Sequence, residues 1–190
     1  MKKVFAVLTI CLAAMTVSFA EESSSPEKNS SDFEKVLLQK GTLLCKEFKD
    51  FDKFSFDGRN GDVTTEIATL TDVNSGAKVY ALRLSNDYYN SQYDSGTAVG
   101  VLDAKELASI VSTFNYIKTV FAGYNSETPY EEITYTSNGG VSLGAYHANK
   151  SSESKIYIKI NYKRSVYCSI DKIDSVISFF EKAQKELESK

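Results

Sequence analysis

The chain has 190 residues, of which 42% are hydrophobic and 25% are charged, and it contains one His and no Trp. This length suits one ordinary domain, and the balance of apolar and charged residues is that of a globular protein. A single His excludes mechanisms that need two imidazoles, which include most zinc-hydrolase sites. The formal charge of −3 argues against nucleic acid as a partner, because phosphate neutralisation needs a basic surface.

Residues 1–20 predict a signal peptide that is cleaved after Ala20. Lys2 and Lys3 precede an apolar run over residues 4–17, and small residues occupy the two positions that signal peptidase requires. The run is too short to span a bilayer and no second run follows, so we expect no membrane span. Cleavage leaves 20 basic and 25 acidic residues, a charge of −5. We therefore expect a periplasmic or secreted protein of the bacterial envelope.

Residues 21–31 have no apolar side chain apart from one proline and predict a disordered tether. A single α+β domain should therefore begin near residue 32 and extend to residue 190. Apolar runs at 36–38 and 42–45 predict strands with a bend between them at Gly41.

The rest of the first half predicts a hairpin, a strand and a helix. Runs at 66–71 and 79–84 flank a turn at Asn74-Ser75-Gly76, and a short strand over 98–102 follows a polar stretch. Asp103 and Glu106 then form a capping box for a helix over 104–122, which carries an apolar stripe at helical spacing.

The second half repeats this order. Asn138-Gly139 is a strong hairpin signal between runs at 132–136 and 141–147. Strands over 155–162 and 166–168 follow, and a second apolar stripe predicts a helix over 170–188.

The two helical stripes match at a constant offset of 66, which also places Glu66-Ile67 on Glu132-Ile133. We therefore expect pseudo-repeats at about 36–123 and 130–190. They should form one antiparallel sheet with both helices packed on one face. This order is similar, at the level of topology, to that of the Whirly and PUR-type single-strand nucleic-acid binders, a likeness that carries no function with it.

Cys45 and Cys168 each lie in an apolar, strand-like run. Disulfides persist outside the cytoplasm, so a bridge between these two residues is one alternative. The other is two buried thiols that never meet. Neither context suggests catalysis, because there is no CxxC motif and no nearby His.

The polar stretch over residues 86–96 has the most unusual composition in the mature chain. Tyrosines are interleaved there with Asp, Asn, Ser and Gln, a mixture typical of recognition loops, since Tyr offers a large contact area at low entropic cost. The predicted binding residues are Asp87, Tyr88, Tyr89, Tyr93 and Asp94. The alternatives are an edge strand blunted by polar residues and a hairpin loop without a ligand.

No catalytic residue, metal site or cofactor is predicted. Residues 140–144 match G-x-S-x-G, but the motif needs a strand-to-helix turn, whereas Ser142 lies within a strand and alternation places His147 on its opposite face. We interpret His147 as a structural histidine at the end of the core face of its strand. The oxygen-rich loop 57–62 does not have the EF-hand spacing.

These observations favour a non-enzymatic binding module for a protein, peptide or glycan of the cell envelope, contacted through the sheet or the Tyr-rich stretch. One alternative is a carboxylate-based hydrolase acting on an envelope or extracellular polymer, which would need two close acids in a cleft. The other is a structural subunit of a surface assembly, which would need a large self-complementary apolar face.

Overall fold

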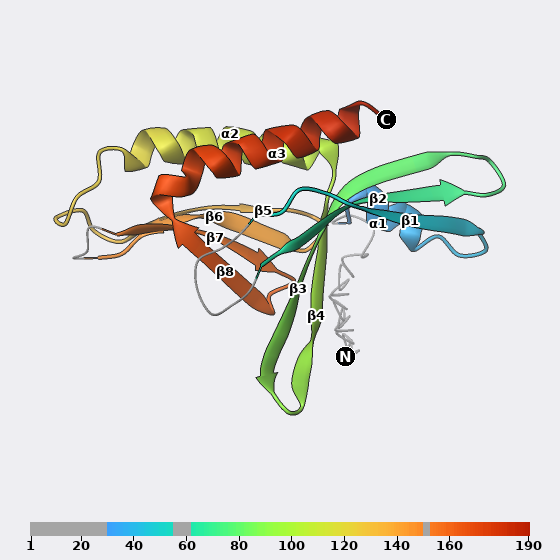
Figure 1. Ribbon diagram of the computed structural model, residues 1–190, viewed down its shortest axis with the longest axis horizontal. Helices are drawn as coiled ribbons and strands as arrows, with labels where there is room; N and C mark the ends of the chain where they lie inside the picture. Colours follow the sequence, from blue (N-terminus) through green and yellow to red (C-terminus); the bar gives the residue numbers. More distant parts are fainter. Residues whose placement is uncertain (1–29, 55–61, 150–152) are drawn as a thin grey trace, which may run out of the picture.

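The computed structural model describes residues 30–54, 62–149 and 153–190, and the predicted signal peptide, most of the tether and most of the oxygen-rich loop lie outside them (Figure 1). The described part contains two four-stranded antiparallel sheets and three α-helices. The predicted α+β class is therefore confirmed. None of the described helices is long and apolar enough to cross a membrane.

Each sheet is a meander in which the strand order follows the chain. The first sheet contains β1 (Leu44–Asp50), β2 (Thr64–Asp72), β3 (Lys78–Ser91) and β4 (Asp94–Leu102), and the second contains β5 (Glu131–Thr136), β6 (Val141–His147), β7 (Ser154–Ile160) and β8 (Arg164–Ser169). Helix α2 (Ala104–Phe121) follows β4, and α3 (Ile173–Glu188) follows β8 after a short 3₁₀ turn (Ile170–Lys172).

The prediction of one continuous sheet is wrong, because β4 and β5 do not pair. A close backbone contact joins the two sheets, where the Val101 amide donates to the Gly139 carbonyl over 2.9 Å. A Cβ at Gly139 would lie 2.1 Å from the Val101 carbonyl oxygen, so only glycine allows this approach.

The predicted repeat is visible only in part. An offset of 66 superposes β4 on β8 and α2 on α3, but it places β2 on β5, whereas the second strand of the second sheet is β6. The cause is the unequal length of the third strands, since β3 has 14 residues and β7 has 7. Positions before the β3–β4 hairpin are therefore shifted relative to their counterparts.

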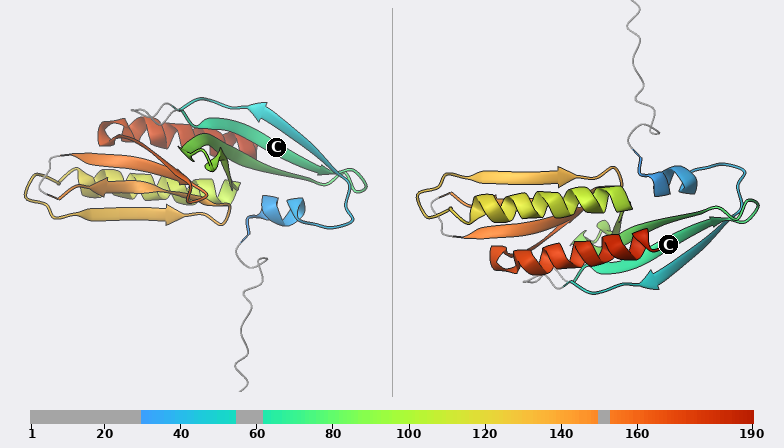
Figure 2. Two further views of the ribbon diagram at one scale, coloured as in Figure 1. Left: turned by 90° about the horizontal axis from the view of Figure 1, so that it is seen from below. Right: turned by 90° about the horizontal axis from the view of Figure 1, so that it is seen from above.

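Helices α2 and α3 lie side by side over the sheets, as Figures 1 and 2 show. Buried apolar side chains from both helices and both sheets form one continuous core. At its centre the rings of Phe114 and Phe180 are stacked with centroids 6.0 Å apart, and neither side chain is exposed. The expectation that both helices cover one face therefore holds for the second sheet.

The described part of the chain opens with a helix, and the strand predicted over 36–38 is wrong. Helix α1 (Asp32–Leu37) has a capping box in which the Ser31 hydroxyl accepts from the Glu34 amide. Phe33 is buried against Ala68 and other residues on the outer face of the first sheet. The Ser-x-x-Glu pattern over residues 31–34 was the signal for this helix, and local apolar content alone was misleading.

Candidate functional site

One face of the second sheet is covered by α2 and α3, and no described helix covers the other (Figures 1 and 2). Side chains alternate along the strands, so that aliphatic residues point inward and polar and aromatic residues point outward. The outward residues surround a shallow hollow of about 480 Å³. We call this surface the tyrosine face; its lining residues are Tyr130, Glu132, Thr134, Ser142, Tyr146, Tyr157, Lys159, Tyr162, Ser165 and Tyr167.

Three tyrosine rings form a row across the tyrosine face. Tyr130 and Tyr146 are stacked with centroids 6.2 Å apart, and Tyr167 meets Tyr146 edge-on, also at 6.2 Å. Tyr130 remains 56% exposed and Tyr167 38% exposed. Each ring thus orders its neighbour and still presents apolar surface to solvent.

Tyr157 lies flat against the sheet beside this row. It pairs with Gly144 on β6, which in turn pairs with Thr134 on β5, and the Tyr157 hydroxyl lies 2.5 Å from Thr134 Oγ1. The Tyr157 ring therefore crosses the β6 backbone at Gly144, where there is no side chain to obstruct it. The side chain is only 8% exposed, so it forms part of the floor of the hollow.

Glu132 is the centre of a hydrogen-bond network on the tyrosine face. Its carboxylate accepts from the Tyr130 hydroxyl over 2.6 Å, from the Tyr157 hydroxyl over 2.7 Å and from Thr134 Oγ1 over 3.2 Å. The bonds from Tyr130 and Tyr157 hold the pKa of Glu132 below its usual range. Burial, together with the bond to Glu132, raises the pKa of Tyr157 to about 12. At neutral pH the network therefore holds one carboxylate and neutral phenols.

The residues that line the hollow of the tyrosine face carry no net charge. Glu132 supplies its carboxylate and Lys159 supplies its ammonium group, and the other lining residues are uncharged at neutral pH. The Lys159 ammonium lies 5.3 Å from the centroid of the Tyr162 ring, a cation–π contact.

The turn between β7 and β8 has an unusual backbone. Asn161 and Tyr162 both have positive φ, at 49° and 57°, and the Lys163 amide donates to the Ile160 carbonyl over 3.1 Å. Turns of this kind favour Asn-Gly, and a residue with a Cβ in the left-handed region costs about 1 kcal/mol. Asn tolerates that region, but a bulky residue such as Tyr is a genuine outlier there.

Hydrogen bonds fix this turn to its surroundings. The Asn161 amide donates to the Gly140 carbonyl over 2.7 Å, and Asn161 Nδ2 donates to the Val99 carbonyl over 3.2 Å. Lys163 Nζ forms an ion pair with Asp94 at 3.2 Å and lies 5.6 Å from the centroid of the Tyr88 ring. The turn therefore joins the tyrosine face to the β3–β4 hairpin.

The residues predicted as a binding loop lie on that hairpin, whose two strands project from the body of the molecule (Figure 1). Tyr88 and Asp94 are brought together with Lys163. Asp87 and Tyr89 point to the opposite face, since successive residues of a strand alternate, and Asp87 accepts from Thr97 Oγ1 over 2.6 Å. Tyr93 lies at the tip and is 91% exposed. The five predicted residues thus do not converge on one site.

The two cysteines lie in different sheets. Cys45 is exposed on β1 and Cys168 is buried on β8 against the helices, and no disulfide joins them. Of the two alternatives, unbridged thiols therefore hold, although Cys45 is exposed and not buried as expected. The physical reason is that β1 and β8 belong to different sheets and are not neighbours.

The structure gives neither Ser142 nor His147 the setting of a hydrolase. Ser142 lies on the tyrosine face with Oγ 3.3 Å from Thr136 Oγ1. His147 is buried on the other side of β6, where Nδ1 lies 2.8 Å from Ser154 Oγ and Nε2 lies 3.1 Å from the Asn125 carbonyl oxygen. The two side chains therefore point to opposite faces, and His147 lies on the core face as predicted, with a partner for each ring nitrogen.

Two neighbouring carboxyl groups, Asp103 and Glu106, have pKa values that burial raises. Both are engaged with backbone amides. Glu106 accepts from the amides of Asp103, over 2.9 Å, and Asn138, over 2.8 Å, and Asp103 accepts from the Asp32 amide over 2.8 Å. These bonds tie α1, α2 and the β5–β6 turn together, so the pair serves the fold.

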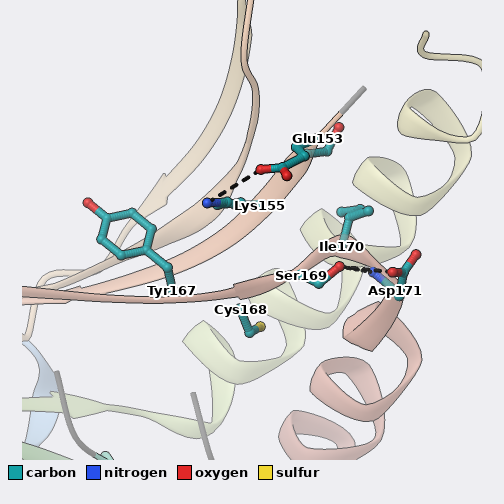
Figure 3. A pocket seen from close by; sticks show the side chains of 8 residues that line it. Glu153, Lys155, Tyr167, Cys168, Ser169, Ile170 and Asp171 are labelled. Carbon is teal, nitrogen blue, oxygen red and sulfur yellow. Dashed lines mark hydrogen bonds and ion pairs between the residues drawn. The ribbon is translucent and has the colours of Figure 1, made fainter. Parts of the chain in front are cut away.

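A second hollow, of about 460 Å³, is lined by the start of β7, the end of β8 and the 3₁₀ turn that follows (Figure 3). Glu153 and Lys155, next to each other at the start of β7, form an ion pair at 3.6 Å, and Ser169 Oγ lies 2.9 Å from the Asp171 carboxylate at the start of the 3₁₀ turn. Its polar groups are thus engaged with one another. Within the described part of the chain, no group of three or more His, Cys, Asp or Glu residues could hold a metal ion.

Sequence reasoning missed the tyrosine face because its members are scattered between residues 130 and 167. The signal was the composition of the outward positions, where Tyr146, Tyr157 and Tyr167 occur in place of the charged residues usual on a solvated sheet. Alternation identified those positions but not the absence of a covering helix.

Comparison with known protein families finds no family that matches this chain, and searches of curated proteins and of solved structures find no match either.

Proposed function

We propose that this protein is a non-enzymatic binding module that contacts a protein, peptide or glycan partner through the tyrosine face. The observation that supports the proposal is the combination of five tyrosines, a hydrogen-bonded carboxylate and a hollow of about 480 Å³ on a sheet face that no described helix covers. Aromatic surface with a few fixed polar groups is typical of ligand sites. We further propose that the partner belongs to the bacterial envelope, to which the predicted signal peptide would direct the chain.

Pre-organisation distinguishes this surface from the Tyr-rich hairpin. On the tyrosine face, ring contacts and the Glu132 network hold Tyr130, Tyr146 and Tyr157 in place before any ligand arrives. A rigid site loses less entropy on binding. Tyr93, by contrast, is almost fully exposed at the hairpin tip. Tyrosine side chains are therefore ordered on the tyrosine face and solvated at the tip of the β3–β4 hairpin.

The proposal can be tested with two matched triple variants. One changes Tyr130, Tyr146 and Tyr167 to Ala, and the other changes Tyr88, Tyr89 and Tyr93 to Ala. Both are screened by thermal shift against soluble oligosaccharides, murein fragments and short peptides. A ligand at a hundredfold its Kd adds about 2.7 kcal/mol, which raises the Tm of a domain of this size by about 5 °C or more.

We expect at least one probe to raise the Tm of the wild type and of the hairpin variant but not that of the tyrosine-face variant. Loss in the hairpin variant alone would move the site to the stretch predicted from sequence and overturn the proposal. A ligand shift that survives both sets of substitutions would overturn it too, as would a wild type that responds to no probe and self-associates through another surface.

A further inference from the structure

We infer that the ligand of the tyrosine face is an uncharged glycan chain and that Tyr162 is a dedicated contact residue for it. This inference rests on the proposed function and adds the chemical class of the ligand. Two independent observations carry it: the strained position of Tyr162 and the charge balance and hydroxyl content of the hollow.

The position of Tyr162 is not explained by the fold. Its backbone occupies the left-handed region, where glycine would be unstrained, so the sequence retains a costly residue at this point. The side chain does not repay that cost by burial, because it is 71% exposed; its ring lines the hollow and lies 5.3 Å from the Lys159 ammonium. Local strain of this kind clusters at sites that bind ligands.

The turn presents the Tyr162 ring in a fixed place. Asn161 is bonded to the Gly140 and Val99 carbonyls, and Lys163 is paired with Asp94, so both neighbours of Tyr162 are anchored. Tyr162 therefore stands at the end of the tyrosine face where it joins the β3–β4 hairpin. A ligand that spans the face would meet it after the row formed by Tyr130, Tyr146 and Tyr167.

The hollow itself favours a neutral, hydroxyl-rich ligand. Its small polar residues are the hydroxyls Thr134, Ser142 and Ser165, and its one carboxylate is balanced by its one ammonium group. A sugar ring has apolar faces that stack on tyrosine and hydroxyls that bond to such groups. A single-stranded nucleic acid or an anionic glycan would need a positively charged groove. An extended peptide would add along the open edge of β5 or β8, whereas the side chains that line the hollow come from all four strands and lie on the face of the sheet.

The test is affinity electrophoresis of the purified protein in native gels. The gels contain one of three neutral glycans, laminarin, glucomannan or soluble starch, or one of two polyanions, alginate or an oligo-dT. We expect at least one neutral glycan to retard the wild type and neither polyanion to do so. Tyr162→Gly should weaken binding to that glycan at least tenfold while its Tm stays equal to or above that of the wild type, because the strain is relieved.

Two further variants make each outcome informative. Tyr162→Phe should retain most of the affinity, since the ring is kept, and Tyr93→Ala, which removes a more exposed tyrosine, should bind as the wild type does. Wild-type binding by Tyr162→Gly would overturn the role of Tyr162, while loss in the variant lacking Tyr130, Tyr146 and Tyr167 would leave the proposed function standing. Retardation by a polyanion only, or by no neutral glycan, would overturn the ligand class; a peptide that binds the tyrosine face in the thermal-shift screen would then identify the partner.

Discussion

The two sheets share a strand order, but their outer faces differ: α1 packs on the outer face of the first sheet, and no described helix covers that of the second. Val101 on β4 and Tyr167 on β8 each directly precede the last core residue of their strand, Leu102 and Cys168. Val101 is 6% exposed because α1 packs over it and its apolar neighbours, whereas Tyr167 is 38% exposed on a face without a helix. Apolar surface is covered on the first sheet, and aromatic, hydroxyl-rich surface is left open on the second, which is the contrast on which the proposed binding role of the tyrosine face rests.

The largest effect should follow from removing the cover of the first sheet. Phe33→Ala takes away the one buried aromatic ring of α1 and leaves a cavity over Ala68 and Val101. We expect the free energy of unfolding to fall by about 3 kcal/mol, measured by urea denaturation. Glycan or peptide binding by the folded protein should not change, because the tyrosine face lies on the other sheet.

Leu38→Ala is the matched control, since Leu38 lies just after α1 and is 65% exposed. It should change the free energy of unfolding by no more than about 0.5 kcal/mol. If Phe33→Ala lowered the free energy of unfolding as little as Leu38→Ala does, packing of α1 would not stabilise the first sheet. The difference between the two outer faces would then need another explanation.

Most helices and strands could be predicted from the sequence, because in those segments the local signals and the tertiary packing favour the same secondary structure. The capping box at Asp103, the Asn138-Gly139 turn and the two apolar stripes all lie within elements that the structure contains. Two failures concern contacts between elements: the split into two sheets and the bridge between Cys45 and Cys168 both depend on strand order. The helix over Phe33 did have a local signal, the capping box of Ser31 and Glu34, which the apolar run after it obscured.

For the candidate site, the sequence predicted the type of residue but not the positions. The proposed site shares its composition, tyrosine mixed with small polar residues, with the contiguous stretch predicted from sequence, whereas Tyr88 and Tyr89 of that stretch point to opposite faces of their hairpin. The tyrosine face is assembled from β5–β8, the residue before β5 and the β7–β8 turn, so it becomes visible only when the strands are paired. The strain at Tyr162 has no signature in the sequence.

A smaller effect should come from the joint between the two halves. Glu106 is 7% exposed and accepts from the amides of Asp103 and Asn138. Glu106→Gln replaces one acceptor oxygen by an NH₂ group that faces a backbone donor, so we expect a loss of about 2 kcal/mol in the free energy of unfolding.

The pH dependence of that loss has a definite sign. Burial raises the pKa of Glu106 in the folded state above its ordinary value of 4.5, so the native protein binds more protons than the unfolded chain from pH 4.5 upward. The stability that Glu106 provides therefore falls as the pH rises through this window. The deficit of Glu106→Gln should be larger at pH 4.5 than at pH 7, measured by urea denaturation at both. Glu127→Gln, at an exposed position, should show neither effect; a deficit that grows with pH would contradict the assignment.

The smallest effect should come from the floor of the tyrosine face. Tyr157→Phe keeps the ring over Gly144 but removes the hydroxyl that donates to Glu132. Since Tyr130 and Thr134 still donate to the carboxylate, we expect a loss of only about 1 kcal/mol. The exposed Tyr116→Phe on α2 serves as the control and should cost less than about 0.5 kcal/mol.

Spectroscopic titration of the tyrosine hydroxyls at high pH reports on Tyr157 separately from most of the other tyrosines. Tyr157 has its pKa raised to about 12, as does Tyr124, so wild-type absorbance should show two phenols that ionise late, and Tyr157→Phe should remove one of them. Because the pKa of Tyr157 is higher in the folded state, its contribution to stability is lost as the pH rises from about 10 toward 12. The deficit of Tyr157→Phe should therefore shrink over that range. An unchanged titration would mean that Tyr157 is solvated, and the rigid floor that separates the second sheet from the covered first sheet would be absent.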